Sequence, residues 1–136
     1  MTADKLDLEI VTPERRVLSE RADSIVLPGS EGYFGVLPGH APLLAALGVG
    51  EVSYREGDRT RFLAVSGGFA EVLDNRVSVL AETCERAEEI DVDRASLSKR
   101  TAEGQLERKE ISESEFRMAE VRLKRAIARI EVARHL

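Results

Sequence analysis

The chain has 136 residues, a formal net charge of −5 and 43% hydrophobic residues, a composition typical of a globular protein with one domain, or one small domain and an appendage. No apolar run approaches the roughly 20 residues that a membrane-spanning helix needs. The sequence has no basic stripe of the kind that indicates binding to nucleic acid. The single cysteine, Cys84, excludes an internal disulfide and a cysteine zinc site.

The first half of the chain has the pattern of strands joined by turns. All four prolines and nine of the ten glycines lie there. Apolar and polar residues alternate over residues 5–10, which predicts a strand with one buried face. Hairpins are predicted across Glu56–Asp58 and across Asp74–Asn75. We therefore predict a small β-sandwich or flattened barrel in residues 1–86, followed by a helical appendage in residues 87–136.

The second half has the composition and the caps of two helices. Asp91 is the predicted N-cap of a helix over about residues 92–107. Ser112, with Glu115 three residues later, forms a predicted capping box for a helix over about residues 113–135. A hairpin of this size has little core of its own. We therefore expect it to need docking against the first half, and to be able to rearrange.

The two predicted helices differ in charge. Residues 85–115 contain six basic and ten acidic residues, whereas residues 116–136 contain six basic and two acidic ones. Antiparallel packing would pair the opposite signs, at about 0–1 kcal/mol for each exposed pair. Arg122, Arg125 and Arg129 lie within about 60° of one another on the second helix. Guanidinium groups match phosphate oxygens. This cluster is therefore interpreted either as a nucleotide site or as arginines that pair with acids on the first helix or stay solvated.

The stretch GSEGYFGVLPGHAPLL, residues 29–44, is rich in glycine and contains His40. A phosphate loop would need GxxxxGK[ST] between a strand and a helix, and this stretch contains no lysine. His40 has no cysteine nearby, and the other histidine is His135, so the spacing indicates no metal site and no catalytic pair. Ser66–Gly68 lacks the GxSxG pattern of a nucleophile elbow. We expect no catalytic residue and no metal ligand, with glycines that build turns.

Four segments, in this order, resemble the epsilon subunit of bacterial F-type ATP synthases: GSEGYFGVLPGHAPLL, VSGGFAEV, SVLAET and IDVDRA. The match covers nearly the whole chain, and residues 28–44 and 65–72 are its most specific parts. The resemblance implies a ten-stranded β-sandwich followed by an antiparallel two-helix hairpin. It also implies a non-catalytic central-stalk subunit of the rotor, which couples ion-driven rotation of the c ring to ATP synthesis and whose C-terminal helices inhibit ATP hydrolysis.

The resemblance further implies where partners bind. The sandwich would contact the gamma subunit and the c-subunit ring, and the extended tail would reach the alpha and beta subunits of the catalytic head. Glu31 and Tyr33, in the loop Ser30–Gly35, would face the c ring, with Tyr33 standing where some relatives have an acidic residue. His40 would lie by the stalk interface. We expect a peripheral subunit on the cytoplasmic face of the bacterial cell membrane, with no insertion of its own and no signal peptide.

Some relatives bind ATP in the folded hairpin, through an Ile-Asp-x-x-Arg-Ala pattern and arginines of the second helix. The corresponding residues here are Glu85, Asp91, Arg94, Arg125 and Arg129. One arginine of that pattern falls on Thr101, and the adjacent Arg100 would point about 100° away on a helix. Regulatory ATP is the one ligand expected, with no other cofactor. Two alternatives stay open: a free-standing ATP sensor that uses the same arginines, and a small enzyme that uses His40 and Ser66.

Overall fold

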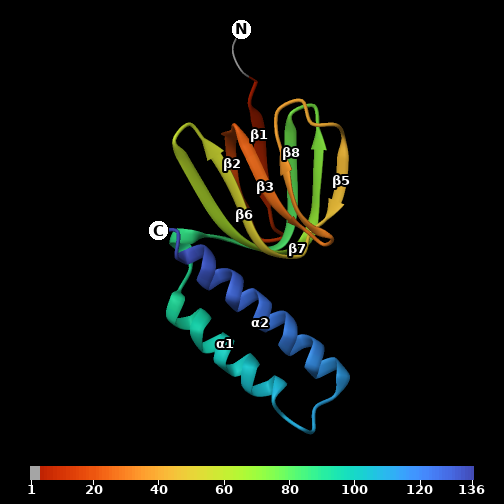
Figure 1. The fold of residues 1–136 in the computed structure, drawn as a ribbon, viewed down its shortest axis with the longest axis vertical. Helices are drawn as coiled ribbons and strands as arrows, with labels where there is room; N and C mark the ends of the chain where they lie inside the picture. Colours follow the sequence, from red (N-terminus) through yellow and green to blue (C-terminus); the bar gives the residue numbers. More distant parts are fainter. Residues whose placement is uncertain (1–3) are drawn as a thin grey trace.

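The computed structural model describes residues 4–136 and shows strands followed by a 3-10 turn and two helices (Figure 1). The strands are β1 (Leu6–Val11), β2 (Arg16–Ala22), β3 (Ser24–Gly29), β4 (Gly32–Val36), β5 (Leu43–Ala46), β6 (Val49–Glu56), β7 (Arg59–Leu73) and β8 (Arg76–Arg86). The remaining elements are η1 (Ala87–Glu89), α1 (Val92–Leu106) and α2 (Glu113–Ala133). Both predicted hairpins are present, as β6–β7 and β7–β8.

Strand β7 bends sharply in its middle. Its side chains in the sandwich core are odd-numbered before the bend, such as Leu63 and Val65, and even-numbered after it, such as Ala70 and Val72. Gly67–Gly68 lies at the change of phase, with φ of 70° and 107°. Side chains alternate across a strand with a period of two, so this change means that the strand passes from one layer of the sandwich to the other.

Strand β8 stays paired with β7 through the bend, and the result is two five-stranded layers in one continuous sheet. The first layer contains β2, β1, the first half of β8, the second half of β7, and β5. The second layer contains the second half of β8, the first half of β7, β6, β3 and β4. The expected ten strands are therefore present as eight within the described residues, because β7 and β8 each serve both layers. Strand β7 is long, with 15 residues, because it passes through both layers.

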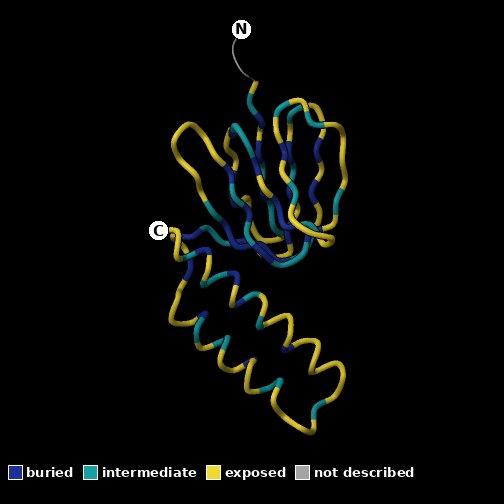
Figure 2. The backbone as a smooth tube through the Cα atoms, viewed as in Figure 1, coloured by how far each residue is buried: buried dark blue, intermediate teal, exposed yellow. Residues whose placement is uncertain are grey.

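The core between the layers is aliphatic. Its largest fully buried side chains are Leu6, Leu8, Ile10, Val17, Ile25, Leu27, Val36, Val52, Leu63, Val65, Val72 and Val77. Full burial of one such side chain contributes about 1.5–3 kcal/mol. The helices depend on a separate and smaller cluster, which contains Ala64, Ala87, Ile90 and Val132. Figure 2 shows the same contrast, with buried residues concentrated in the sandwich and a largely exposed hairpin.

The helices begin at the predicted caps. The Asp91 carboxylate accepts the backbone N–H of Arg94 at 3.1 Å, and the Ser112 hydroxyl accepts that of Glu115 at 3.1 Å. The Ser112 hydroxyl also donates to the Glu115 carboxylate at 2.9 Å, so the second bond of the predicted box joins two side chains. Helix α2 lies next to the sandwich and α1 packs beyond it (Figure 1). Small side chains allow this close approach; the buried ones are Ala95, Ala102, Ala119 and Ala126.

The connection between the sandwich and the helices is anchored at Glu89. Both carboxylate oxygens of Glu89 bind the Arg15 guanidinium, at 3.0 and 3.1 Å, and one of them also accepts the backbone N–H of Arg86 at 3.1 Å. The Arg86 guanidinium in turn donates to the carbonyl oxygen of Val17. The hydrogen bond from Arg15 lowers the pKa of the Glu89 carboxyl. The chain is therefore fixed to the sandwich up to the end of η1.

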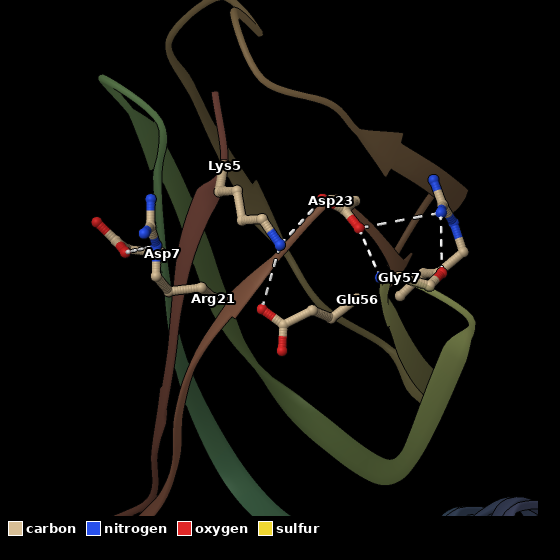
Figure 3. A network of polar contacts seen from close by, with 7 residues as sticks. Lys5, Asp7, Arg21, Asp23, Glu56 and Gly57 are labelled. Atoms are coloured by element: carbon tan, nitrogen blue, oxygen red, sulfur yellow. Dashed lines mark hydrogen bonds and ion pairs between the residues drawn. The ribbon is translucent and has the colours of Figure 1, made fainter. Parts of the chain in front are cut away.

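A second polar network joins β1, β3 and the β6–β7 hairpin, at the end of the sandwich far from the helices (Figure 3). The Asp23 carboxylate accepts the backbone N–H of Gly57 at 2.7 Å. The Lys5 ammonium lies 3.4 Å from Asp23 and 3.4 Å from Glu56. The hydrogen bond from Gly57, and then the charge of Lys5, hold the pKa of the Asp23 carboxyl below its usual value.

The Asp23→Asn variant tests this network through its pH dependence. A carboxyl with a lowered pKa stabilises the fold above the pKa of the unfolded chain, about 3.9. That contribution is lost as the pH falls through the lower folded value. We expect Asp23→Asn to be less stable at pH 7 and to lose less stability between about pH 5 and pH 2. Urea unfolding across this range measures the effect.

The matched control for this experiment is Asp7→Asn, which removes an exposed ion pair with Arg21 at 3.7 Å (Figure 3). A pH profile of Asp23→Asn that is parallel to the wild-type profile would contradict the assignment.

Candidate functional site

A pocket of about 260 Å³ lies between α2 and the second layer of the sandwich. Its lining consists of Ala64, Val65, Ser66, Thr83, Cys84, Glu85, Ser98, Arg122, Arg125, Ala126, Ala128 and Arg129. Three of these residues are arginines and one is a carboxylate, so the charged lining is positive. Apolar walls and a few convergent polar groups are typical of ligand sites.

Two arginines of α2 hold the helix against the sandwich. The Arg129 guanidinium binds both oxygens of Glu85 on β8, with Nε···Oε1 at 2.6 Å and Nη2···Oε2 at 3.3 Å. The Nε of Arg125 donates to the hydroxyl of Ser66 on β7 at 2.7 Å, and its Nη2 lies 3.6 Å from Glu82. Contacts through two nitrogens of one guanidinium group fix the orientation of its plane as well as its position. The pocket therefore has arginines that are already oriented.

The expected pairing of the basic segment 116–136 with acids of the segment 85–115 is present in part, at Glu85 and Glu113, but neither of these acids lies in α1. Within residues 4–136, the ion pairs of α2 and the C-terminal residues reach Glu113 of the same helix and three carboxylates of the sandwich, Glu51, Glu82 and Glu85. Arg125 and Arg129 face β7 and β8, on the side of α2 that packs against the sandwich. Arg122 alone among the three in the pocket turns toward α1, where its Nη1 donates to Gln105 at 3.4 Å.

The structure brings together part of the predicted nucleotide set. Glu85, Arg125 and Arg129 line the pocket. Asp91 and Arg94 do not line it; they lie exposed at the start of α1, where Asp91 acts as the N-cap. Thr101 is also exposed on α1 and outside the lining.

The structure adds Ser66, Thr83 and Ser98 as polar groups of the pocket. Sequence reasoning missed them as pocket residues because an isolated serine or threonine has no distinctive spacing.

The residues considered for catalysis have other partners. The Ser66 hydroxyl accepts a bond from Arg125, and the Nδ1 of His40 lies 2.6 Å from the carbonyl oxygen of Ala41. Burial raises the pKa of the Cys84 thiol to about 12. A thiol in that state is protonated at neutral pH and is a poor nucleophile. The arrangement of these three side chains therefore gives no support to covalent catalysis.

The outer face of the first layer carries exposed apolar side chains, and we call Leu44, Phe69, Leu73 and Leu80 the apolar face. Phe69 and Leu80 are direct partners in the β7–β8 register and are 56% and 61% exposed. Leu44, on β5, pairs with Glu71 of β7, and Leu73 lies two residues further along β7. Contiguous exposed apolar side chains mark interaction sites. The helices leave this face uncovered because they pack against the second layer.

The predicted turn in residues 29–44 is present between β3 and β4. Gly29 pairs with Gly32, so Ser30 and Glu31 form its exposed tip. Tyr33 is 61% exposed, and its hydroxyl accepts the backbone N–H of Glu51 at 3.0 Å. The turn therefore presents one carboxylate and one aromatic ring to solvent.

The His40 turn is tied to the edge of the apolar face. The backbone N–H of Gly39 donates to the side-chain oxygen of Asn75 at 2.7 Å, and that of His40 to the carbonyl oxygen of Leu37 at 3.1 Å. Asn75 lies in the hairpin that follows Leu73. The turn that carries His40 is therefore held close to this face by the hydrogen bond from Gly39 to the Asn75 side chain.

Comparison with known families agrees with these two parts of the molecule. Residues 5–87 match the beta-sandwich domain of the ATP synthase delta/epsilon chain, and residues 88–134 match the long alpha-helix domain of the same chain. The chain belongs to the ATP synthase delta/epsilon chain family. Within the described residues, no helix has both the length and the apolar character needed to cross a membrane.

Two curated members of the family illustrate the similarity. The ATP synthase epsilon chain of Syntrophobacter fumaroxidans is 50% identical over 131 residues, which cover 96% of this chain and 97% of that protein. The ATP synthase epsilon chain of Nitratidesulfovibrio vulgaris strain DP4 is 52% identical over 128 residues, which cover 93% and 94%. The family relationship therefore extends through both the sandwich and the helices.

Two solved structures share the fold. A chain in the cryo-EM structure of the Euglena gracilis mitochondrial ATP synthase (OSCP, F1 and c-ring) has a TM-score of 0.83 at 24% identity, and the match covers 99% of this chain and 85% of that one. A chain in the Tetrahymena thermophila central stalk and c-ring structure has a TM-score of 0.64 at 16% identity, with 98% and 99% covered. At these identities the likeness concerns the fold.

Proposed function

We propose that this chain is a non-catalytic central-stalk subunit of an F-type ATP synthase, which couples rotation of the c ring to ATP synthesis. Family membership over both parts of the chain supports this proposal, and the single structural observation behind it is the uncovered apolar face. Residues 1–86 form the docking domain and residues 87–136 the regulatory tail. The subunit is peripheral and lies on the cytoplasmic side of the bacterial membrane.

The gamma subunit is the proposed partner of the apolar face. Buried aromatic side chains near the centre of an interface contribute most of the binding energy in many complexes, and Phe69 occupies that position, beside Leu80 and near Leu44. His40 lies at the rim, where polar residues are common. The proposed contact with the c-ring loops is made by a different part of the sandwich, the β3–β4 turn, through Glu31 and Tyr33.

The proposed tail inhibits ATP hydrolysis when it leaves the sandwich. Helices α1 and α2 have 15 and 21 residues and span roughly 22 and 32 Å at 1.5 Å per residue. When extended along the gamma subunit, they reach the alpha and beta subunits of the catalytic head. Residues 116–136 have four more basic than acidic residues, which suits an acidic surface on that head.

Capture from the organism's own membranes in mild detergent tests the rotor function. Tagged wild-type chain should recover the gamma, catalytic-head and c subunits together. Phe69→Asp should lose most of this recovery, because it buries a charge in the interface.

Leu97→Asp is the matched control for capture, since Leu97 is 57% exposed on α1, away from the apolar face. Recovery of the wild-type chain alone would refute the rotor function and would favour the free-standing ATP sensor.

Truncation after Glu89 tests the inhibitory tail. The anchor at Glu89 remains, so the sandwich should still assemble with the complex. We expect ATP hydrolysis by the truncated complex to rise several-fold over that of the intact complex, at equal recovery of all subunits. Equal rates of hydrolysis would refute inhibition by the tail and leave the docking function in place.

Regulatory ATP is the proposed ligand of the pocket, bound by Arg125 and Arg129, with Glu85 beside them. Asp91 and Arg94, the other residues of the expected set, lie outside the pocket and would join the site only through a movement of α1. An anion that binds the docked tail and not the released tail stabilises docking by RT ln(1 + [L]/Kd). The pocket also supports the second candidate function, an ATP sensor that works without the complex.

Calorimetric titration of the isolated chain with ATP tests this site. Arg129→Gln should weaken binding by about ten- to a hundredfold, because it removes a charge-assisted contact. Arg117→Gln is the control, since Arg117 is exposed and pairs with Glu113 of its own helix at 2.6 Å. Equal affinities for the two variants would show that the arginines serve docking alone.

A further inference from the structure

The last turn of the tail makes a specific contact with the sandwich. The imidazole of His135 stacks on the ring of Phe62, with the ring centroids 3.5 Å apart and the planes 8° from parallel. Its Nε2 lies 2.6 Å from Oε1 of Glu51. Phe62 is on β7 and Glu51 on the adjacent strand β6. One side chain beyond the end of α2 therefore reaches two strands.

The backbone of Glu51 is held by contacts within the sandwich. The backbone N–H of Glu51 donates to the Tyr33 hydroxyl at 3.0 Å, at a point beyond the β3–β6 ladder. Glu51 also pairs with Ala64 of β7. Its carboxylate side chain is 24% exposed, and the His135 side chain is 37% exposed, so the pair is partly screened from water.

The rest of the docking surface is small. Its buried apolar members are Ala64, Ala87, Ile90 and Val132, with Phe62 and Ala133 packed against them. The polar contacts of Arg125 and Arg129 lie further toward the start of α2. A helix held by so few side chains gains a large share of its docking free energy from each specific contact at its end.

We propose that His135 is a latch that holds the regulatory tail on the sandwich through Glu51 and Phe62. Without the latch the tail is released more often, although the apolar cluster and the arginines are unchanged. The docking part of this proposal concerns the isolated chain; its consequence for hydrolysis rests on the proposed function.

Hydrogen exchange of the full-length chain, followed by mass spectrometry, tests the latch. His135→Ala removes both contacts and should raise the opening equilibrium across α2 by about three- to tenfold, the size expected for an aromatic stack and one close polar contact. Arg134→Ala is the matched control, since Arg134 is exposed in the same turn. Exchange like that of Arg134→Ala, or faster exchange confined to the last turn, would overturn the proposal.

A double-mutant cycle separates the two contacts. His135→Phe keeps a ring against Phe62 and loses the contact with Glu51, so it should have a smaller effect than His135→Ala. Glu51→Gln should raise exchange of α2 in the wild-type background and have no effect in His135→Phe. An equal effect of Glu51→Gln in both backgrounds would show that Glu51 acts through something other than His135.

The failure of the latch is distinguishable from failure of the proposed function. The apolar face is on the other layer, so His135→Ala should leave capture of the complex unchanged. In the intact complex, a tail that is released more often should lower ATP hydrolysis. Faster exchange of α2 with unchanged hydrolysis would support the latch and refute inhibition by the tail.

Discussion

The whole arrangement depends on one place in the chain that admits no side chain. A Cβ atom on Gly68 would lie 1.9 Å from the carbonyl oxygen of Leu80. The backbone of Gly68 also has a φ of 107°, which is strained for other residues. This close approach lets β7 and β8 turn together from one layer into the other. The backbone N–H of Leu47 donates to the Gly68 carbonyl, and that of Gly67 to the Gly48 carbonyl. Because of this corner, the apolar face and the pocket lie on different layers.

Local features of the sequence predicted local features of the fold. Alternation in residues 5–10 predicted β1, and Asp91 and Ser112 predicted the starts of the helices, because strands and caps depend on neighbours in the chain. The Gly67–Gly68 pair looks like a break between short strands, since glycine weakens a strand. Only the pairing with β8, which is a tertiary contact, shows that one strand continues through it.

The candidate site was predictable only in part, for an electrostatic reason. Helical spacing correctly placed Arg122, Arg125 and Arg129 on one side of α2. The sequence could not decide which carboxylates these arginines contact, because α1 and β8 both contain acidic residues. Attraction between opposite charges is not directional, so it does not select one set over the other. The contact of His135 with Glu51 and Phe62 had no signal, since it joins residues that are far apart in the chain and have no shared pattern.

The anchor at Glu89 determines where the proposed release of the tail can begin. Arg15 and the Arg86 backbone fix the chain to the sandwich as far as Glu89, so the proposed release would turn the hairpin about Ile90 and Asp91. No strand has to separate from the sheet for that release. In the proposed function, the apolar face therefore keeps its shape whether the tail is docked or released.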